Sequence, residues 1–206
     1  MPMASKKSPL RRKPQRAASP VDGVAVARVT ANRDPEALCR VQVRYPWHAE
    51  PAKRYWARLA SPMAGADRGV VFLPEPGDEV LVAFERGDLR FPYVVGALWN
   101  GQARPPETNP DGKNDRRVIK SRKGHKLAFD DGANGRIELT LNSGKKLTID
   151  DNEMRLDDGK GNRIVIQSDT HSVTIAAEGH LRLVASTISI EASGTLTARG
   201  ALINLN

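Results

Sequence analysis

The sequence predicts an all-β protein, with a small closed barrel in the first half of the chain and a rod of short stacked strands in the second. Short runs of alternating apolar and polar residues recur between turn-forming residues, whereas no stretch has the 3.6-residue period of a helix. The aromatic residues are unevenly placed, because nine of the ten occur before position 100 and only Phe129 follows. A conventional core is therefore expected in the first half and a thinner one in the second.

Five alternating runs predict the strands of the barrel, which we place within residues 21–101. Turn residues separate the runs, among them the Pro-Glu-Pro-Gly-Asp segment at 74–78. Gly96 lies inside the last run, where it indicates a bend in a barrel strand. Five strands in about 80 residues suit a small barrel of the OB or SH3-like type. The five runs are residues 24–29, 41–45, 55–59, 79–84 and 92–98, and a shorter run, 70–73, precedes the fourth.

A repeated pattern occupies residues 117–206, which we expect to form the rod. Each copy begins with a glycine, after which two apolar residues alternate with polar ones. A recurring unit of one or two strands with a glycine corner predicts a β-solenoid or β-helix. Roughly eleven short strands, stacked at about 4.8 Å, give a shaft on the order of 50 Å. Clear copies begin at Gly124, Gly144 and Gly161, and degraded ones at Gly179 and Gly194.

Three identical chains wound together explain the rod better than one. The strands supply few apolar residues, and glycine spacings between 15 and 20 residues fit a one-chain helix with equal turns poorly. Copies that share an axis bury the same faces and cover strand edges that otherwise invite aggregation. We therefore favour an intertwined triple-stranded β-helix, a homotrimeric needle, over a monomeric solenoid. The residues expected on the trimer axis are Leu127, Phe129, Leu147, Ile149, Ile164, Ile166, Val173, Ile175, Leu181, Leu183, Ile188 and Ile190.

The net charge of +8 is concentrated at the N-terminus. Residues 1–16 carry six cations and no acidic residue, so the rest of the chain is close to +2. The composition of residues 1–20 predicts a disordered basic tail, with a docking arm for an acidic partner as the alternative. Residues 102–116, rich in proline, glycine and polar residues, are expected to form a neck between barrel and rod.

No constellation in the sequence predicts catalysis, a cofactor or a metal site. The four histidines form neither an HExxH nor an H-x-H motif. The aspartate pairs at 130–131, 150–151 and 157–158 recur at strand ends, which indicates solvated corners rather than a calcium site. The segment Ser143-Gly-Lys-Lys146 lacks the first glycine of a phosphate loop. We therefore expect a protein that is not an enzyme.

The sequence gives no signal for export or membrane insertion. No apolar segment follows the basic N-terminus, so no secretory signal peptide is predicted. No run approaches the 18 apolar residues of a membrane-spanning helix. The single cysteine, Cys39, excludes an internal disulfide, and its alternating surroundings predict a small buried side chain.

Longer ordered blocks of residues resemble a known family. They closely resemble the VgrG / phage baseplate assembly protein V family, the central spikes of contractile injection systems, over about residues 21–206. The chain is similar to a short form of that family without the preceding hub domain. The blocks are Arg40-Val-Gln-Val-Arg-Tyr-Pro-Trp47, Gly77-Asp-Glu-Val-Leu-Val-Ala-Phe84, Pro92-Tyr-Val-Val-Gly-Ala-Leu-Trp-Asn-Gly101 and Ser121-Arg-Lys-Gly-His-Lys-Leu-Ala-Phe-Asp-Asp131.

The resemblance implies an OB-fold domain on a trimeric needle at the tip of a phage tail, type VI apparatus or extracellular injection particle. Such a spike plugs the inner tube and mechanically pierces the target envelope. It implies assembly in the bacterial cytoplasm into a phage-tail-like particle, with a separate hub or baseplate protein on the N-terminal side. Because the last residues lack the H-x-H metal motif of some phage spikes, a PAAR-type tip protein is expected on Leu202, Ile203 and Leu205.

Two other functions remain open at this point. An OB-fold nucleic-acid-binding protein with a β-solenoid extension would use stacking aromatics and cations, for which Trp47, Tyr55, Trp56, Lys53 and Arg54 are available. We expect instead that these rings brace the barrel and that no nucleic acid binds. A polysaccharide-acting β-helix enzyme would need a carboxylate cluster on one rod face, which the dispersed aspartates do not obviously supply.

Overall fold

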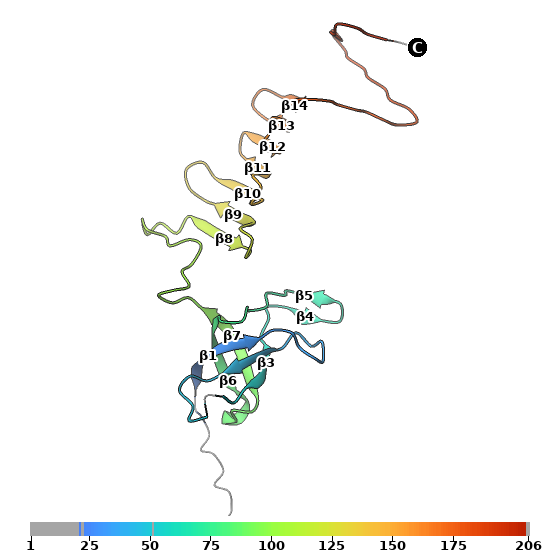
Figure 1. Cartoon of the computed structure of the whole chain (residues 1–206). Helices are drawn as coiled ribbons and strands as arrows, with labels where there is room; N and C mark the ends of the chain where they lie inside the picture. The colour runs from blue at the N-terminus through green and yellow to red at the C-terminus, as the bar shows by residue number, and fades with distance from the viewer. Residues whose placement is uncertain (1–20, 22, 51, 205–206) are drawn as a thin grey trace, which may run out of the picture. The chain divides into compact units, whose positions relative to one another are not determined.

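The computed structural model describes residues 21, 23–50 and 52–204; the basic tail 1–20, residues 22 and 51, and Leu205 and Asn206 lie outside it. The chain divides into two compact units, Met1–Pro105 and Pro106–Asn206, and each is described by itself (Figure 1). In the described residues every regular element is a strand except a short 3-10 helix, η1 (Glu85–Gly87). No helix in this part of the chain is long and apolar enough to cross a membrane. The predicted all-β class is confirmed.

The first unit is a closed barrel of five strands, in the order β1-β2-β3-β7-β6. Neighbouring strands run antiparallel, except that β3 and β7 are parallel. Each of the five alternating runs lies on one of these strands, so the predicted OB-like barrel is confirmed. The strands are β1 (Val24–Ala31), β2 (Val41–Arg44), β3 (Tyr55–Leu59), β6 (Glu79–Phe84) and β7 (Pro92–Leu98).

The barrel core consists of every second residue of these strands. In β6 the even-numbered residues from Val80 to Phe84 are buried, and those between them are partly exposed. Tyr45 directly follows β2 and is only 1% exposed; its hydroxyl donates a hydrogen bond to the carbonyl oxygen of Leu89 at 2.9 Å. Beside Gly96 the β6–β7 register slips by one residue. This bulge bends the strand where the sequence predicted a bend.

Two local expectations for the barrel are wrong. Cys39 is exposed, because it lies in the loop between β1 and β2 with a left-handed backbone φ of 54°. Residues 70–73 form no strand, and a two-stranded hairpin of β4 (Ala64–Gly65) and β5 (Arg68–Gly69) precedes them. The run around Cys39 alternates and residues 70–73 are apolar throughout, but the five barrel strands already close on one another and leave no place in the ladder for a sixth.

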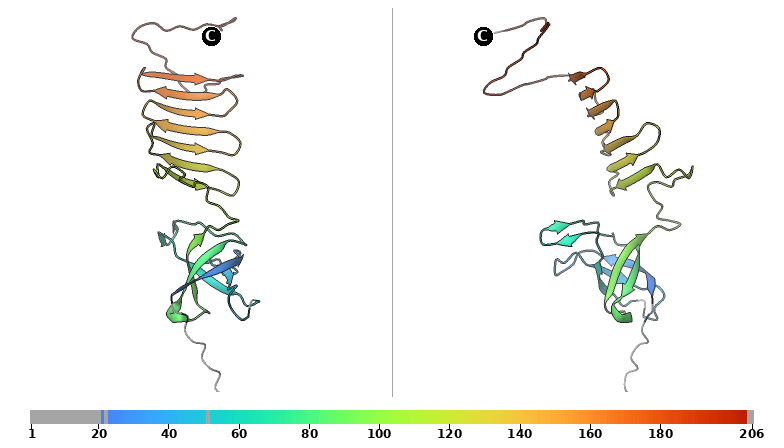
Figure 2. Two further views of the ribbon diagram at one scale, coloured as in Figure 1. Left: turned by 90° about the vertical axis from the view of Figure 1, so that its left-hand side faces the viewer. Right: turned by 180° about the vertical axis from the view of Figure 1, so that it is seen from behind.

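The second unit contains one seven-stranded antiparallel sheet, in which the strands follow one another in sequence order (Figure 2). Each strand is 5 residues long. These strands contain the alternating runs predicted between residues 127 and 175. They are β8 (Arg116–Lys120), β9 (Lys126–Asp130), β10 (Arg136–Thr140), β11 (Lys146–Asp150), β12 (Glu153–Asp157), β13 (Arg163–Gln167) and β14 (Ser172–Ala176).

Glycine is required at the corners that open the repeats. Gly124, Gly144 and Gly161 have φ values of 88°, 91° and 98°, which residues with a Cβ atom adopt only with strain. The N–H groups of Gly124 and Gly144 each donate to the carbonyl oxygen three residues earlier, on Ser121 and Leu141, at 2.9 Å. The recurring glycine is therefore the turn residue that sends the chain back into the next strand.

The sheet ends at Ala176, and the described residues 177–204 form no strand. The alternating runs at 181–183 and 188–190 predict further strands, and for the single chain this prediction is wrong. The single chain also has fewer rod strands than the roughly eleven expected. A strand exists only where a neighbouring strand supplies hydrogen-bond partners. Beyond β14 the chain turns away from the sheet (Figure 1), so alternation alone does not extend the ladder.

Candidate functional site

One face of the seven-stranded sheet consists of large apolar side chains, and we call it the apolar face. Successive residues of a strand point to opposite faces, and the regular register keeps the same face aligned from strand to strand. Ile164, for example, pairs with Leu156 on one side and with Ile175 on the other. One column consists of Ile119, Leu127, Leu139, Leu147, Leu156, Ile164 and Ile175, and a second of Phe129, Ile137, Ile149, Met154, Ile166 and Val173.

The apolar face is open to solvent in the single chain. Leu147 is 38% exposed, Leu156 53% and Val173 66%. Soluble proteins rarely expose a contiguous apolar patch of this extent unless the patch is an interaction site. Two uninterrupted columns on one face are therefore a candidate binding surface rather than scattered surface residues.

The opposite face is polar, and its charged side chains cover a central row of small buried residues. Ala128, Thr148 and Val165 lie along its middle and are 4%, 9% and 5% exposed. Longer charged side chains flank these small residues; Arg155, for example, pairs with Glu153 at 3.0 Å and with Asp157 at 3.5 Å. This face presents charged, ion-paired side chains to water and leaves no large apolar side chain uncovered. The two faces of the sheet are thus chemically distinct.

Glu138 ties three strands together on the polar face. Its carboxylate pairs with Lys146 on β11 at 2.6 Å and with Lys126 on β9 at 3.8 Å, and it accepts a hydrogen bond from the hydroxyl of Thr140 at 2.9 Å. Partial burial acts to raise the pKa of this carboxyl, but the bonds from Lys146 and Thr140 outweigh it and hold the pKa below its usual value. Glu138 therefore stays ionised at neutral pH.

The structure brings together eight of the twelve residues predicted for the trimer axis, all of them on the apolar face. Five further residues of this face come from β10 and β12, which lie between glycine-led copies, and from β8, which precedes the first copy. For β10 and β12 the sequence contains a signal, because the runs at 137–141 and 154–156 also alternate. The eight are Leu127, Phe129, Leu147, Ile149, Ile164, Ile166, Val173 and Ile175, and the five are Ile119, Ile137, Leu139, Met154 and Leu156.

The remaining predicted residues lie outside the sheet. Four of the predicted axis residues belong to the strandless segment 177–204 and are exposed in the single chain. Leu202 and Ile203, predicted to hold a tip protein, are 78% and 51% exposed. The third residue of that prediction, Leu205, lies beyond the described residues. The four axis residues are Leu181, Leu183, Ile188 and Ile190.

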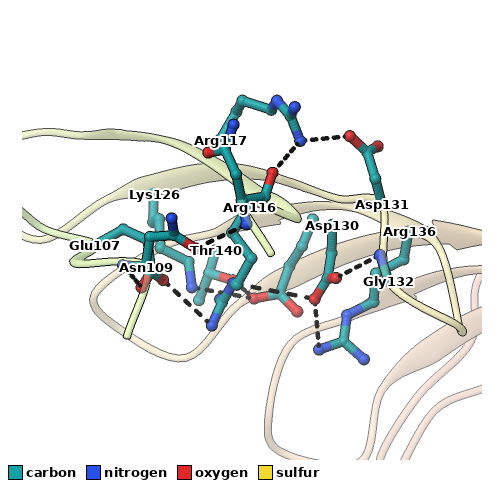
Figure 3. A network of polar contacts seen from close by, with 12 residues as sticks. Glu107, Asn109, Arg116, Arg117, Lys126, Asp130, Asp131, Gly132, Arg136 and Thr140 are labelled. Atoms are coloured by element: carbon teal, nitrogen blue, oxygen red, sulfur yellow. Dashed lines mark hydrogen bonds and ion pairs between the residues drawn. The ribbon is translucent and has the colours of Figure 1, made fainter. Parts of the chain in front are cut away.

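The first aspartate pair takes part in a polar network at the start of the sheet (Figure 3). Asp131 pairs with Arg117 at 2.6 Å, and Asp130 lies 4.0 Å from Arg116 and 3.9 Å from Arg136. Arg116 also reaches Glu107 at 3.5 Å. The network joins residues that precede β8 to the first three strands.

Asp150 and Asp158, from the other two pairs, are acceptors within turns. Asp150 accepts hydrogen bonds from the backbone N–H groups of Glu153 and Asn152, at 2.8 and 2.9 Å, and these bonds lower the pKa of its carboxyl. Asp158 accepts hydrogen bonds from the side chain and the backbone of Asn162. Within the described residues, no group of three His, Cys, Asp or Glu side chains is placed to hold a metal ion.

The barrel aromatics considered for nucleic-acid stacking contact other residues of the barrel. Trp47 stacks on Tyr45 with ring centroids 5.4 Å apart, and its indole N–H donates to the carbonyl oxygen of Val26 at 3.0 Å. Tyr55, on β3, also stacks on Tyr45, with ring centroids 5.2 Å apart. Arg40 lies over the ring of Trp56, 5.7 Å from its centroid. These contacts brace the barrel wall.

The barrel matches a known domain family. Residues 25–99, which span all five barrel strands apart from the first residue of β1, match the family model for the type VI secretion system/phage-baseplate injector OB domain. The first unit is therefore an injector OB domain.

Curated relatives match a stretch of similar length. The chain is 36% identical over 101 residues to the type VI secretion system spike protein VgrG2a of Pseudomonas aeruginosa, which is 45% of this chain and 12% of that protein. It is 31% identical, again over 101 residues, to the actin cross-linking toxin VgrG1 of Vibrio cholerae, of which 9% is covered. The chain thus spans about a tenth of the length of these relatives. Over this shared region the chain is similar to the VgrG spike proteins.

Proposed function

We propose that this protein is the structural central spike of a contractile injection machine, a phage tail, type VI apparatus or extracellular injection particle. The observation that carries the proposal is the uncovered apolar face that follows an injector OB domain in the same chain. In the assembled spike, three copies turn their apolar faces toward a common axis, and their polar faces form the outside of the needle.

The energetics favour such an assembly. Burying the exposed half of one Leu or Ile side chain contributes on the order of 1 kcal/mol. Thirteen such residues per chain therefore offset the translational and rotational entropy that three chains lose on association, on the order of 10 kcal/mol. A single chain leaves this free energy unused.

The same arrangement supplies stiffness. In each wall the backbone hydrogen bonds join neighbouring strands, so bending the needle strains many of them at once. A rod of this kind plugs the inner tube of the machine and pierces the target envelope mechanically, with its polar outer faces toward the membrane. It requires no cofactor and no catalytic residue.

The proposed spike has two further partners. A separate hub or baseplate protein is the proposed partner on the N-terminal side. A PAAR-type tip protein docks at the C-terminal end, where Leu202 and Ile203 are exposed. The protein is made in the bacterial cytoplasm and becomes part of the particle there.

The oligomeric state tests the proposal. Light scattering at micromolar concentration is expected to give the mass of a trimer, and a monomer would overturn the assignment. Ile166→Asp places three carboxylates on the axis and is expected to abolish the trimer. The matched control is Thr174→Asp, which adds the same charge to the exposed polar face and is expected to leave the trimer intact.

A further inference from the structure

The turns of the sheet lie in two columns, one along each side of it. Because the seven strands form a simple meander, alternate turns fall on opposite sides, as the left view of Figure 2 shows. The turns after β8, β10 and β12 are residues 121–125, 141–145 and 158–162. The turns after β9, β11 and β13 are residues 131–135, 151–152 and 168–171.

The first column is basic, and we call it the basic border. Its three turns hold four cations and a single carboxylate, Asp158. The strand ends on the same side add four more cations and one carboxylate, Asp157. Glu178 follows β14 on this side. The cations are Arg122, Lys123, Lys145 and Lys160 in the turns and Lys120, Lys126, Lys146 and Arg163 at the strand ends.

The second column is acidic, and we call it the acidic border. Each of its three turns contains one aspartate and no lysine or arginine. The strand ends on this side contribute Asp130, Asp150 and Glu153 against Arg116 and Arg136. The turn aspartates Asp131, Asp151 and Asp169 are all exposed, although Asp131 pairs with Arg117 of its own chain.

The two borders are offset along the sheet by one strand. Asp151 lies in the turn between β11 and β12, and the turns of Lys145 and Lys160 are the next ones below and above it on the other border. One strand spacing is about 4.8 Å. Copies placed side by side at the same height therefore bring the turns of Asp131 and Asp151 of one copy level with the two gaps between basic turns of the next, and the turn of Asp169 lies just above the last basic turn, that of Lys160.

We propose that the basic border of one chain docks against the acidic border of the next copy in the assembled needle. This inference rests on the proposed three-chain assembly and specifies how neighbouring walls meet. In a closed ring each chain presents both borders, one to each neighbour, so that every basic column faces an acidic one. The partner is a second copy of this chain because the complementary charges flank the apolar face that the copies share.

The charges also specify the direction of the chains. A copy turned upside down, with its apolar face still toward the axis, would exchange its two borders. It would then place lysines against lysines and aspartates against aspartates of its neighbours. Like charges in contact disfavour the wrong partner or the wrong orientation more than complementary charges strengthen the right one. The borders thus select a parallel assembly.

Charge reversal on the full-length chain tests the inference. The basic-border variant carries Lys145→Glu and Lys160→Glu, the acidic-border variant carries Asp151→Lys and Asp169→Lys, and the double-border variant carries all four changes. At low ionic strength, light scattering is expected to show loss of trimer for each single-border variant and its recovery in the double-border variant. Arg33→Glu with Arg104→Glu, which changes the same net charge in the other unit, is the matched control and is expected to remain trimeric.

Co-expression of two tagged chains gives a second readout that does not depend on stability. Wild-type and double-border chains are expected to form separate trimers, because each mixed contact sets like charges together; raised salt is expected to allow mixing, since it screens the borders. Native mass spectrometry counts the species. Free mixing at low salt, or single-border variants as trimeric as the control, would overturn the border pairing while leaving the spike proposal intact. A monomeric wild-type chain would overturn the spike proposal itself.

Discussion

Asp34 holds the loop between β1 and β2 in an unusual conformation. Its carboxylate accepts hydrogen bonds from the backbone N–H groups of Glu36, Leu38 and Arg40, at 3.1, 3.0 and 3.2 Å. The guanidinium of Arg40 adds two more, at 2.8 and 3.0 Å. Ala37 and Cys39, in the same loop, have left-handed φ values of 55° and 54°. The Asp34 carboxylate thus supplies the backbone hydrogen-bond acceptors that a neighbouring strand would supply in a sheet.

The substitution Asp34→Asn is expected to lower the Tm of the barrel at neutral pH, because it removes the ion pair and weakens three backbone contacts. The hydrogen bonds from Arg40 hold the pKa of Asp34 well below its ordinary value of 3.8. A lowered pKa means that the stabilisation is complete above pH 3.8 and is lost as the pH falls toward the folded-state value. The Tm difference between wild type and variant is therefore expected to be constant near neutrality and to shrink below that pH.

Glu36→Gln is the matched control for this loop. Glu36 also pairs with Arg40, at 3.0 Å, but its side chain is 64% exposed. Exposed pairs of this kind contribute little. A Tm loss for Glu36→Gln as large as that for Asp34→Asn would contradict the role assigned to Asp34.

At the scale of the element, most of the fold can be predicted from the alternation of apolar and polar residues and from the corner glycines. The five barrel strands and the strands from β9 to β14 follow from runs with a period of two, because that period places one set of side chains on one face. Alternation does not identify the neighbouring strand. For this reason the exposed loop around Cys39 and the strandless segment 177–204 could not be predicted from their local sequence.

The candidate site was predictable to a similar extent. The glycine-led copies predict the apolar residues of β9, β11 and β13, and an alternating run between copies predicts Val173 and Ile175 of β14, whereas the apolar residues of β8, β10 and β12 are not among the predicted axis residues. Only the register, in which for example Leu139 pairs with both Leu127 and Leu147, unites the two sets on one face. The two charged borders likewise cannot be recognised without the meander, because it brings turns that are far apart in sequence to the same side of the sheet.

The corner at Gly144 gives a prediction for a single turn. Its φ is 91° and nothing lies within 4 Å of an added Cβ, so Gly144→Ala strains only the backbone. We expect a loss of on the order of 1–2 kcal/mol per chain in the free energy of unfolding, measured by chemical denaturation. Gly179→Ala, which also meets nothing within 4 Å but has no left-handed φ, is the control. Equal losses at both sites would contradict a conformational cause.

At the scale of the whole molecule, the chain combines a self-sufficient part with a dependent one. The barrel buries its own core, including Val80 and Val82 at 0% exposure. The sheet instead leaves its largest side chains on the surface. The barrel therefore carries the similarity to injector OB domains, and the sheet carries the uncovered apolar face on which the proposed assembly rests.

Deletion of residues 201–206 separates the proposed tip contact from the proposed trimer. The apolar face between β8 and β14 remains whole in this variant, so a trimer of unchanged mass is expected by light scattering. Capture of a purified PAAR-type tip protein is expected to be lost, because the exposed Leu202 and Ile203 are removed. Capture as strong as that of the full chain would place the tip contact elsewhere.

The meander also makes length an adjustable property. Each strand from β8 to β14 pairs only with its neighbours in sequence, so no long-range connection depends on how many there are. Insertion or loss of two consecutive strands with their turns changes the shaft by roughly 10 Å and returns every later turn to its own border. A change of one strand moves all later turns to the opposite border. Evolution can therefore lengthen or shorten the sheet, but only in steps of whole hairpins if each turn is to keep its border.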